Sequence, residues 1–515
     1  MIKNFKWLLL VSLTFVACNT DDEDTTVVEV PVVAGSADFS KYVALGNSLT
    51  AGYSDNALFK AGQEHAYPKL IADQFALAGG GAFTIPYTND NIGGLLLAGN
   101  VIAAPRLIFQ NGAPTVLPNS IPTNEITTTL TGPFNNLGVP GAKSYHLLAA
   151  NYGNAAGVMT GAANPYFVRF RSSASTSIIA DAMAQSPTFF SLWIGNNDVL
   201  GYATSGGTGV NQAGNMNPAT YASSDITDPS VFASVYESLV NALTANGAKG
   251  VVANIPNVTS IPYFTTIPTN PLPGLPEASA AQLNQLFGGV NQALTASGLP
   301  TRFVTLVSDD GNPATKEKNQ LLIKDESLIN ISAQITAALS PVLGVPTATY
   351  LGSIYGQARH ASSAPGSKDY IVLTAQSVIG SIQAGAPSPF NTVGVSYPMQ
   401  DSTTLTASEA TEVIAATTAF NTSIKALADA KGLAFVDVNT LMTQLANGGV
   451  RFDNFNMTAA FVQGGAFGLD GVHLTARANA YIANQFMMAI NATYGSTLRM
   501  YKPGDFPISY PASLQ

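Results

Sequence analysis

The sequence predicts an α/β fold in which a parallel β-sheet is covered by helices on both faces. Short apolar segments that suit buried strands alternate with longer segments whose apolar residues recur at helical spacing. Polar, glycine-containing turns follow several of these strands. Because parallel strands need a crossover between them, the alternation indicates repeated βαβ units.

Four segments have the composition of buried strands. Residues 42–45 (YVAL) are apolar and precede a Gly-Asn-Ser turn. Residues 188–194 (TFFSLWI) are apolar enough to be buried on both faces and end at Gly195. Residues 250–257 (GVVANIPN) and 433–438 (LAFVDV) each follow a helical segment, which gives the βαβ order.

Helical periodicity marks the segments between these strands. Residues 67–77 and 231–245 place apolar side chains on one face, and residues 413–427 do the same before the last strand. The final helix is expected over 475–490, with Thr475 as its N-cap.

The chain divides into one large domain with insertions. We expect the domain to span 39–500 and to be followed by a tail at 501–515. The proline-rich region 262–408 breaks the strand and helix order and indicates an insertion or cap. Residues 79–130, rich in Gly, Thr and Pro, indicate a smaller insertion. Insertions at strand ends commonly shape substrate pockets, so we expect this of both.

Composition excludes nucleic acid as a partner. The 515-residue chain is 46% hydrophobic and only 10% charged, and its formal net charge is -9. Phosphate binding requires clustered Lys and Arg, and no such cluster is present in the sequence.

The N-terminus has the pattern of a signal peptide over residues 1–17. Two lysines precede an apolar run that is too short to span a bilayer. Cys18, the only cysteine, directly follows Phe-Val-Ala, which resembles a bacterial lipoprotein cleavage site. We therefore expect Cys18 to be lipidated and to begin the mature protein. Phe15 stands where Leu is usual, so a secreted soluble product stays an alternative.

Residues 18–38 are expected to form an acidic linker behind the lipid anchor. Asp21-Asp-Glu-Asp24 is read first as a solvated tether, and it also resembles the surface-export signals of lipoproteins from Bacteroidota. These features predict a protein of the cell envelope, held by its lipid at the outer membrane, with exposure at the surface as one alternative. The anchor predicts membrane attachment without predicting the face.

Only four histidines are available as a general base. His473 lies three residues after Asp470, in GLDGVHLTARA. A base needs one imidazole nitrogen to reach a hydroxyl and a carboxylate to hold the other, and this spacing can supply both from one loop. His65, His146 and His360 are better explained as loop, surface or core residues.

Further polar residues lie in turns near the predicted strands. Ser48 follows the first strand in YVALGNSLTAGY, and Asn197 follows another in SLWIGNNDVLG. Gly141 lies in FNNLGVPGAKS, where a glycine lets the backbone approach a ligand closely. Each motif alone has a plain structural explanation as a turn.

Together the blocks GNSLT, NLGVPGA, GNND and DGVH, in this order, resemble the four sequence blocks of the SGNH/GDSL hydrolase family. The resemblance implies a three-layer, flavodoxin-like α/β/α domain and a serine ester hydrolase of lipase or carboxylesterase type. It implies Ser48 as nucleophile, Asp470 and His473 as its partners, and no metal or cofactor. The implied oxyanion hole combines the Ser48 and Gly141 backbone N–H groups with the Asn197 side chain.

The sequence departs from the family pattern at Asn47, where the family has Asp. Two alternatives stay open: a carbohydrate acetylesterase of the same family, and a surface lipoprotein that binds nutrients without catalysis. The α/β-hydrolase fold is set aside because its Gly-x-Ser-x-Gly elbow would need Gly where Thr50 stands. Asp309 and Asp310 have some of the pattern of a calcium loop but fit a plain turn better.

Overall fold

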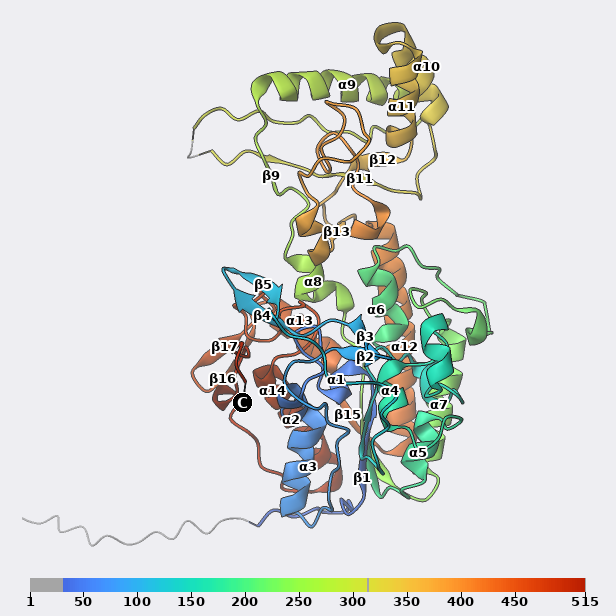
Figure 1. Ribbon diagram of the computed structural model, residues 1–515, viewed down its shortest axis with the longest axis vertical. Coiled ribbons are helices and arrows are strands. Elements are labelled where there is room, and N and C mark those ends of the chain that lie inside the picture. Colours follow the sequence, from blue (N-terminus) through green and yellow to red (C-terminus); the bar gives the residue numbers. More distant parts are fainter. Residues whose placement is uncertain (1–30, 313–314, 515) are drawn as a thin grey trace, which may run out of the picture.

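The computed structural model describes residues 31–312 and 315–514 (Figure 1). The predicted signal peptide, Cys18 and the acidic stretch 21–24 lie outside the described residues. In the part of the chain that is described, no helix combines the length and the apolar character needed to cross a membrane.

A five-stranded parallel sheet forms the centre of the molecule, which confirms the predicted α/β class. Its strands are β1 (Tyr42–Gly46), β6 (Asn136–Gly138), β7 (Phe189–Trp193), β8 (Lys249–Ala253) and β15 (Ala434–Val436). They lie in the order β15-β8-β7-β1-β6. Counted along the chain from the β6 edge, the order is 2-1-3-4-5.

This order places β1 between β6 and β7. Gly46, at the end of β1, pairs with Gly138 on one side and with Trp193 on the other. The chain therefore leaves β1 toward one edge of the sheet and later returns to its other side. At such a reversal the connections diverge and leave a crevice at the carboxyl ends of the strands, where open α/β sheets bind ligands.

Side chains of the strands alternate between two hydrophobic cores, one on each face of the sheet. Tyr42 and Ala44 of β1 belong to one core, and Val43 and Leu45 belong to the other. Because both sets are apolar, both faces must be covered.

Helices cover both faces, as predicted (Figure 1). Residues of α3 (Tyr67–Leu77) and α14 (Ala476–Tyr494) pack with Tyr42 on one face. Residues of α5 (Ile178–Met183), α7 (Pro229–Thr244) and α12 (Ala407–Lys431) pack on the other face.

The helix boundaries follow from capping. Thr475 is the N-cap of α14, as predicted, because its side chain accepts a hydrogen bond from the Ala478 backbone N–H. The helix predicted over 413–427 begins earlier, at Ala407, because Thr406 and Glu409 form a capping box.

Region 79–130 forms two β-hairpins against the body. The first pairs β2 (Leu95–Leu97) with β3 (Asn100–Ala103), and the second pairs β4 (Leu107–Gln110) with β5 (Ala113–Val116).

Residues 272–360 form an upper lobe, at the top of Figure 1. The lobe contains α9 (Glu277–Ala296), α10 (Ser332–Leu343) and α11 (Val345–Tyr355). These helices enclose a third hydrophobic cluster that includes Phe287 and Tyr355 and is distinct from the two cores on the sheet.

The remaining elements are short. The helices are α1 (Ser48–Ala51), α2 (Lys60–Glu64), α4 (Pro165–Phe170), α6 (Asn197–Thr204), α8 (Pro262–Thr265) and α13 (Val438–Ala446). The strands are β9 (Leu272–Pro273), β10 (Lys318–Asn319), β11 (Leu322–Lys324), β12 (Ala358–His360), β13 (Tyr370–Ile371), β14 (Thr404–Leu405), β16 (Val450–Phe452) and β17 (Phe455–Met457).

The segment after residue 500 packs onto the body. Tyr510 is buried, and its hydroxyl lies 2.9 Å from Nδ1 of His65. The guanidinium of the buried Arg106 donates hydrogen bonds to the backbone carbonyls of Pro511 and Ala512. These bonds join the end of the chain to the β4 region.

Candidate active site

Ser48 lies at the carboxyl end of β1, as the first residue of α1. The turn between them is tight, since a Cβ at Gly46 would collide with the Thr50 hydroxyl. Asn47 caps α1 by accepting a hydrogen bond from the Leu49 backbone N–H. The turn therefore holds the serine at the sheet edge where the crevice lies.

His473 and Asp470 meet Ser48 in the arrangement that the sequence predicts. Nε2 of His473 lies 2.9 Å from the Ser48 hydroxyl oxygen. Nδ1 of His473 lies 2.8 Å from Oδ2 of Asp470. The serine and histidine are 425 residues apart in sequence. The carboxylate fixes the imidazole so that its second nitrogen faces the hydroxyl.

Asp470 is held as a carboxylate by several donors. Its Oδ1 accepts hydrogen bonds from the backbone N–H groups of Val472 and His473, and its Oδ2 accepts one from Asn56. Burial by itself would raise the pKa of Asp470, but His473 and the backbone donors outweigh it and lower the pKa to about 2. Asp470 is therefore ionised at neutral pH.

Asn197 and Gly141 lie in two neighbouring loops. Asn197 begins α6, and its Nδ2 donates a hydrogen bond of 2.9 Å to the carbonyl of Ala142, the residue after Gly141. Gly141 has a φ of 80°, a backbone conformation that favours glycine. The Nδ2 group has two hydrogens, so one remains for a ligand.

A second asparagine pair connects the serine turn to α6. Nδ2 of Asn47 donates to Oδ1 of Asn196 across 3.2 Å, and both side chains are buried. The sequence does not predict this bond, although Asn47 stands where the family pattern has Asp. An Asp at position 47, when ionised, could not donate this hydrogen bond.

A turn at Asp55 and Asn56 holds the loop that carries Asp470 and His473, which we call the histidine loop. The sequence does not predict this contact either. Asp55 and Asn56 have positive φ angles, 48° and 63°, and mutual backbone hydrogen bonds between Ser54 and Ala57 close the turn. Oδ1 of Asp55 accepts a hydrogen bond of 2.8 Å from the backbone N–H of Leu469. The Asn56 backbone N–H donates to Asp470, so the turn is bonded to the loop at two consecutive residues, Leu469 and Asp470.

Asp55 is itself a buried carboxyl group beside Asp470. Burial raises the pKa of Asp55 to about 6, and the Asp470 charge acts in the same direction. The Leu469 N–H and the charges of Arg106 and His473 oppose this shift. Asp55 therefore gains or loses its proton in mildly acidic solution, close to the histidine.

An apolar pocket opens beside Ser48. The pocket is open to solvent, and its free volume of about 90 Å³ is smaller than the roughly 300–1,000 Å³ of typical small-molecule sites. Ser48, Asn197 and His473 line it, whereas Asp470 lies behind the histidine. The lining contains no Asp, Glu, Lys or Arg, and most of it is aliphatic.

The walls of this pocket do not come from the predicted insertion. None of the described residues of 262–408 lines the pocket, so the expectation that this insertion shapes it is wrong for this cavity. The walls come largely from α13, the β16–β17 hairpin and α14. The insertion contacts the loop of His473, where the Tyr263 backbone N–H donates a hydrogen bond of 3.0 Å to the carbonyl of Gly471.

The other three histidines are engaged elsewhere. His65 faces Tyr510, and His146 accepts a hydrogen bond at Nδ1 from the Lys143 backbone N–H. Burial lowers the pKa of His146 to about 3 and that of His360 to about 4, which keeps both rings neutral.

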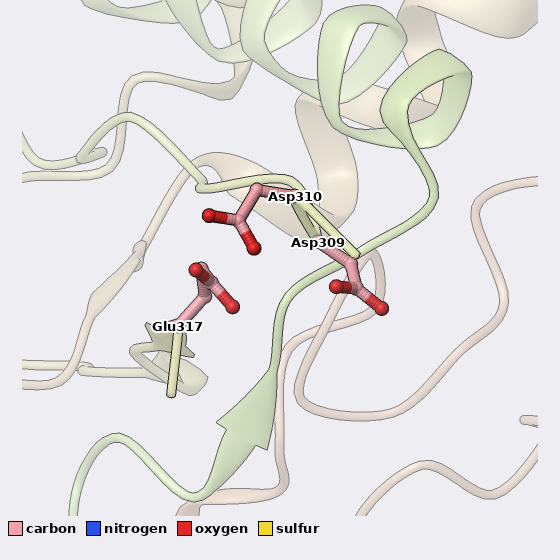
Figure 2. A group of neighbouring side chains, drawn as sticks. All are labelled: Asp309, Asp310 and Glu317. Carbon is pink, nitrogen blue, oxygen red and sulfur yellow. The ribbon is translucent and has the colours of Figure 1, made fainter. Parts of the chain in front are cut away.

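An acidic group lies on an exposed loop of the upper lobe. The carboxylates of Asp309, Asp310 and Glu317 lie within 4.8 Å of one another (Figure 2). Asp309 accepts a hydrogen bond from the Gly311 backbone N–H, and Asp310 accepts one from Asn312. These are the bonds of a tight turn, which is the structure predicted for this segment.

A second acidic group, Glu326, Asp401 and Glu409, lies between the upper lobe and α12. Burial and the neighbouring Glu326 raise the pKa of Asp401 to about 8. Burial raises the pKa of Glu409 to about 7. The neutral forms of Asp401 and Glu409 are therefore favoured more than those of isolated carboxyl groups.

Comparisons with models of known protein families, with curated proteins and with solved structures find no match to this chain.

The raised pKa of Asp55 predicts a pH-dependent change in stability. The folded protein holds the Asp55 proton more tightly than the unfolded chain does, so this carboxyl destabilises the fold as pH rises through about 6. Relative to wild type, Asp55→Asn should gain about 2 kcal/mol in its free energy of unfolding between about pH 4 and pH 7.5. Urea unfolding at both pH values measures this. A difference that does not change with pH contradicts it, and Asp453→Asn, at an exposed carboxylate, serves as control.

Proposed function

We propose that this protein is a serine ester hydrolase in which Ser48 is the nucleophile. The proposal rests on one observation above all: the unbroken chain of contacts from Asp470 through His473 to the Ser48 hydroxyl, at 2.8 and 2.9 Å. A serine hydroxyl becomes nucleophilic when a base so placed can take its proton. The adjoining pocket gives an ester access to that hydroxyl.

The mechanism follows from the geometry. His473 takes the Ser48 proton through Nε2 as the oxygen attacks the ester carbonyl, and the ionised Asp470 stabilises the imidazolium that forms. The imidazolium then protonates the leaving alcohol, and water releases the acyl group by the reverse path. The free hydrogen of Asn197 Nδ2 and the backbone N–H groups of Ser48 and Gly141 are the proposed donors to the oxyanion.

The fold supports assignment to the SGNH/GDSL type of hydrolase. The strand order 2-1-3-4-5, with helices on both faces, is the flavodoxin-like arrangement that the sequence resemblance implies. All four resembling blocks lie at the same edge of the sheet or in loops beside it. Asn47 donates a hydrogen bond to Asn196, so the serine turn is joined to the start of α6 without the family Asp.

Attachment to the cell envelope through Cys18 is the accompanying proposal. The pattern at residues 1–18 supports it. The described chain begins against the body, where the Ser36 backbone N–H donates to the Tyr494 carbonyl, on the α14 side of the sheet.

Ser48→Ala should abolish hydrolysis of p-nitrophenyl esters, with kcat reduced by more than about a thousandfold, because no other group replaces the nucleophile. A fluorophosphonate probe should label wild-type Ser48 and leave Ser48→Ala unlabelled. Ser238→Ala, at an exposed serine of α7, is the matched control. Failure of the folded wild type to react with the probe would favour the nutrient-binding alternative.

Asn197→Ala should reduce kcat by about a hundredfold or more with a smaller change in KM, because its amide binds the oxyanion mainly in the transition state. Steady-state kinetics with p-nitrophenyl butyrate measures the effect. Asn241→Ala, at an exposed asparagine of α7, should behave as wild type. Unchanged turnover in Asn197→Ala would remove this residue from the oxyanion hole.

Cys18→Ser should prevent lipidation and release the protein from membranes. Incorporation of labelled palmitate and the distribution between membrane and soluble fractions measure this in bacteria that express the full chain. The esterase activity of the released protein should be unchanged, since position 18 lies outside the folded domain. Equal labelling of Cys18→Ser and wild type would contradict the lipoprotein assignment.

A further inference from the structure

The apolar walls of the pocket form a continuous surface beside Ser48. We call this surface the apolar arm and define it by six residues of α13 and the β16–β17 hairpin: Val438, Leu441, Met442, Leu445, Val450 and Met457. None of these side chains carries a nitrogen or oxygen atom. Four of them, Met442, Leu445, Val450 and Met457, belong to the hydrophobic core that also contains residues of α5, α7 and α12.

Apart from Tyr481 of α14, the polar side chains of the pocket are concentrated where the chemistry is proposed. Ser48 and His473 react, and the Asn side chains belong to the serine turn and the start of α6. The indole N–H of Trp193 is already used, because it donates to the carbonyl of Asn254. A sugar has hydroxyl groups on every side, and the apolar arm offers them no partner, so burying them there would be costly.

We propose that the apolar arm binds the aliphatic chain of a fatty-acid ester, and that Met442 and Met457 set the chain length accepted. This inference rests on the proposed role of Ser48. The acyl group stays bonded to Ser48 until water arrives, whereas the alcohol must leave at once. The apolar arm therefore suits the acyl part, and the leaving alcohol takes the route to solvent.

Met442 and Met457 are the two flexible side chains of the apolar arm. Met442 comes from α13 and Met457 from β17, so two separate elements supply one side chain each. Both are nearly buried, at 5% and 4% exposure, yet both line the open space. Methionine is flexible and polarizable and adapts to a linear aliphatic ligand.

The first experiment compares acyl chains on the wild-type protein. For p-nitrophenyl esters, kcat/KM should rise at least about tenfold from acetate to octanoate, since each buried methylene contributes. Octyl acetate, which places the long chain on the alcohol, should be hydrolysed more slowly than ethyl octanoate. A flat series, a preference for octyl acetate, or a preference for acetylated xylan overturns the inference.

The second experiment places larger side chains in the apolar arm. Met442→Trp and, separately, the milder Met457→Phe should reduce kcat/KM for octanoate by at least about tenfold and leave acetate within about twofold. Met159→Trp changes a methionine that is 77% exposed and should keep the wild-type series. Labelling by a small fluorophosphonate at the wild-type rate shows that each variant is folded and that Ser48 works.

The outcomes separate the two proposals. If Ser48 is labelled and esters are cleaved but both filled variants keep the octanoate preference, the arm is not the acyl site and the hydrolase proposal stands. If folded wild-type protein is neither labelled nor active on any ester, both proposals fail. If octanoate activity falls in both filled variants while acetate activity and labelling persist, the apolar arm is the acyl site.

Discussion

The contact between His473 and Ser48 depends on how β1 sits in the sheet. Because β1 lies between β6 and β7, its last residue is flanked by the ends of both neighbours, and the loops that follow all three strands converge there. The serine turn, the Gly141 loop and the start of α6 are then joined by two side-chain amides, Asn47 and Asn197. The histidine loop arrives from the other end of the chain and completes the site.

Two buried carboxyl groups beside the imidazole have opposite pKa shifts, and their hydrogen bonds explain the difference. Asp470 accepts three backbone N–H bonds and faces His473, so its charged form is favoured despite burial. Asp55 accepts one such bond, from Leu469, and lies near the Asp470 charge, so its neutral form is favoured. The two positive φ angles and the raised pKa show a turn that is costly to the fold and that orients Asp470.

Two segments added to the sheet differ in what they contact: the upper lobe packs mainly on itself, and the segment between β15 and α14 lines the pocket. The upper lobe has its own hydrophobic cluster, and the insertion that contains the lobe contacts the loop of His473 through α8, where the Tyr263 backbone N–H donates to the Gly471 carbonyl. The pocket instead takes its apolar walls from the region between β15 and α14, which is short and packs directly on the core. Length in sequence is therefore a poor guide to which segment contacts the ligand space, because a long insertion can fold on itself.

The sequence by itself predicted the α/β class and the main helices, because hydrophobic periodicity and turn residues are local signals. Ser48, Asp470 and His473 became candidates through four short blocks that resemble a known family, and their roles stay a proposal. The sequence did not determine the three-residue strand β6, which is too short to have a period of its own and which establishes the strand order. Only the tertiary structure decided the Asp55 turn, the bond between Asn47 and Asn196, and the source of the pocket walls. These depend on contacts between segments far apart in the chain, for which a single sequence carries no periodic signal.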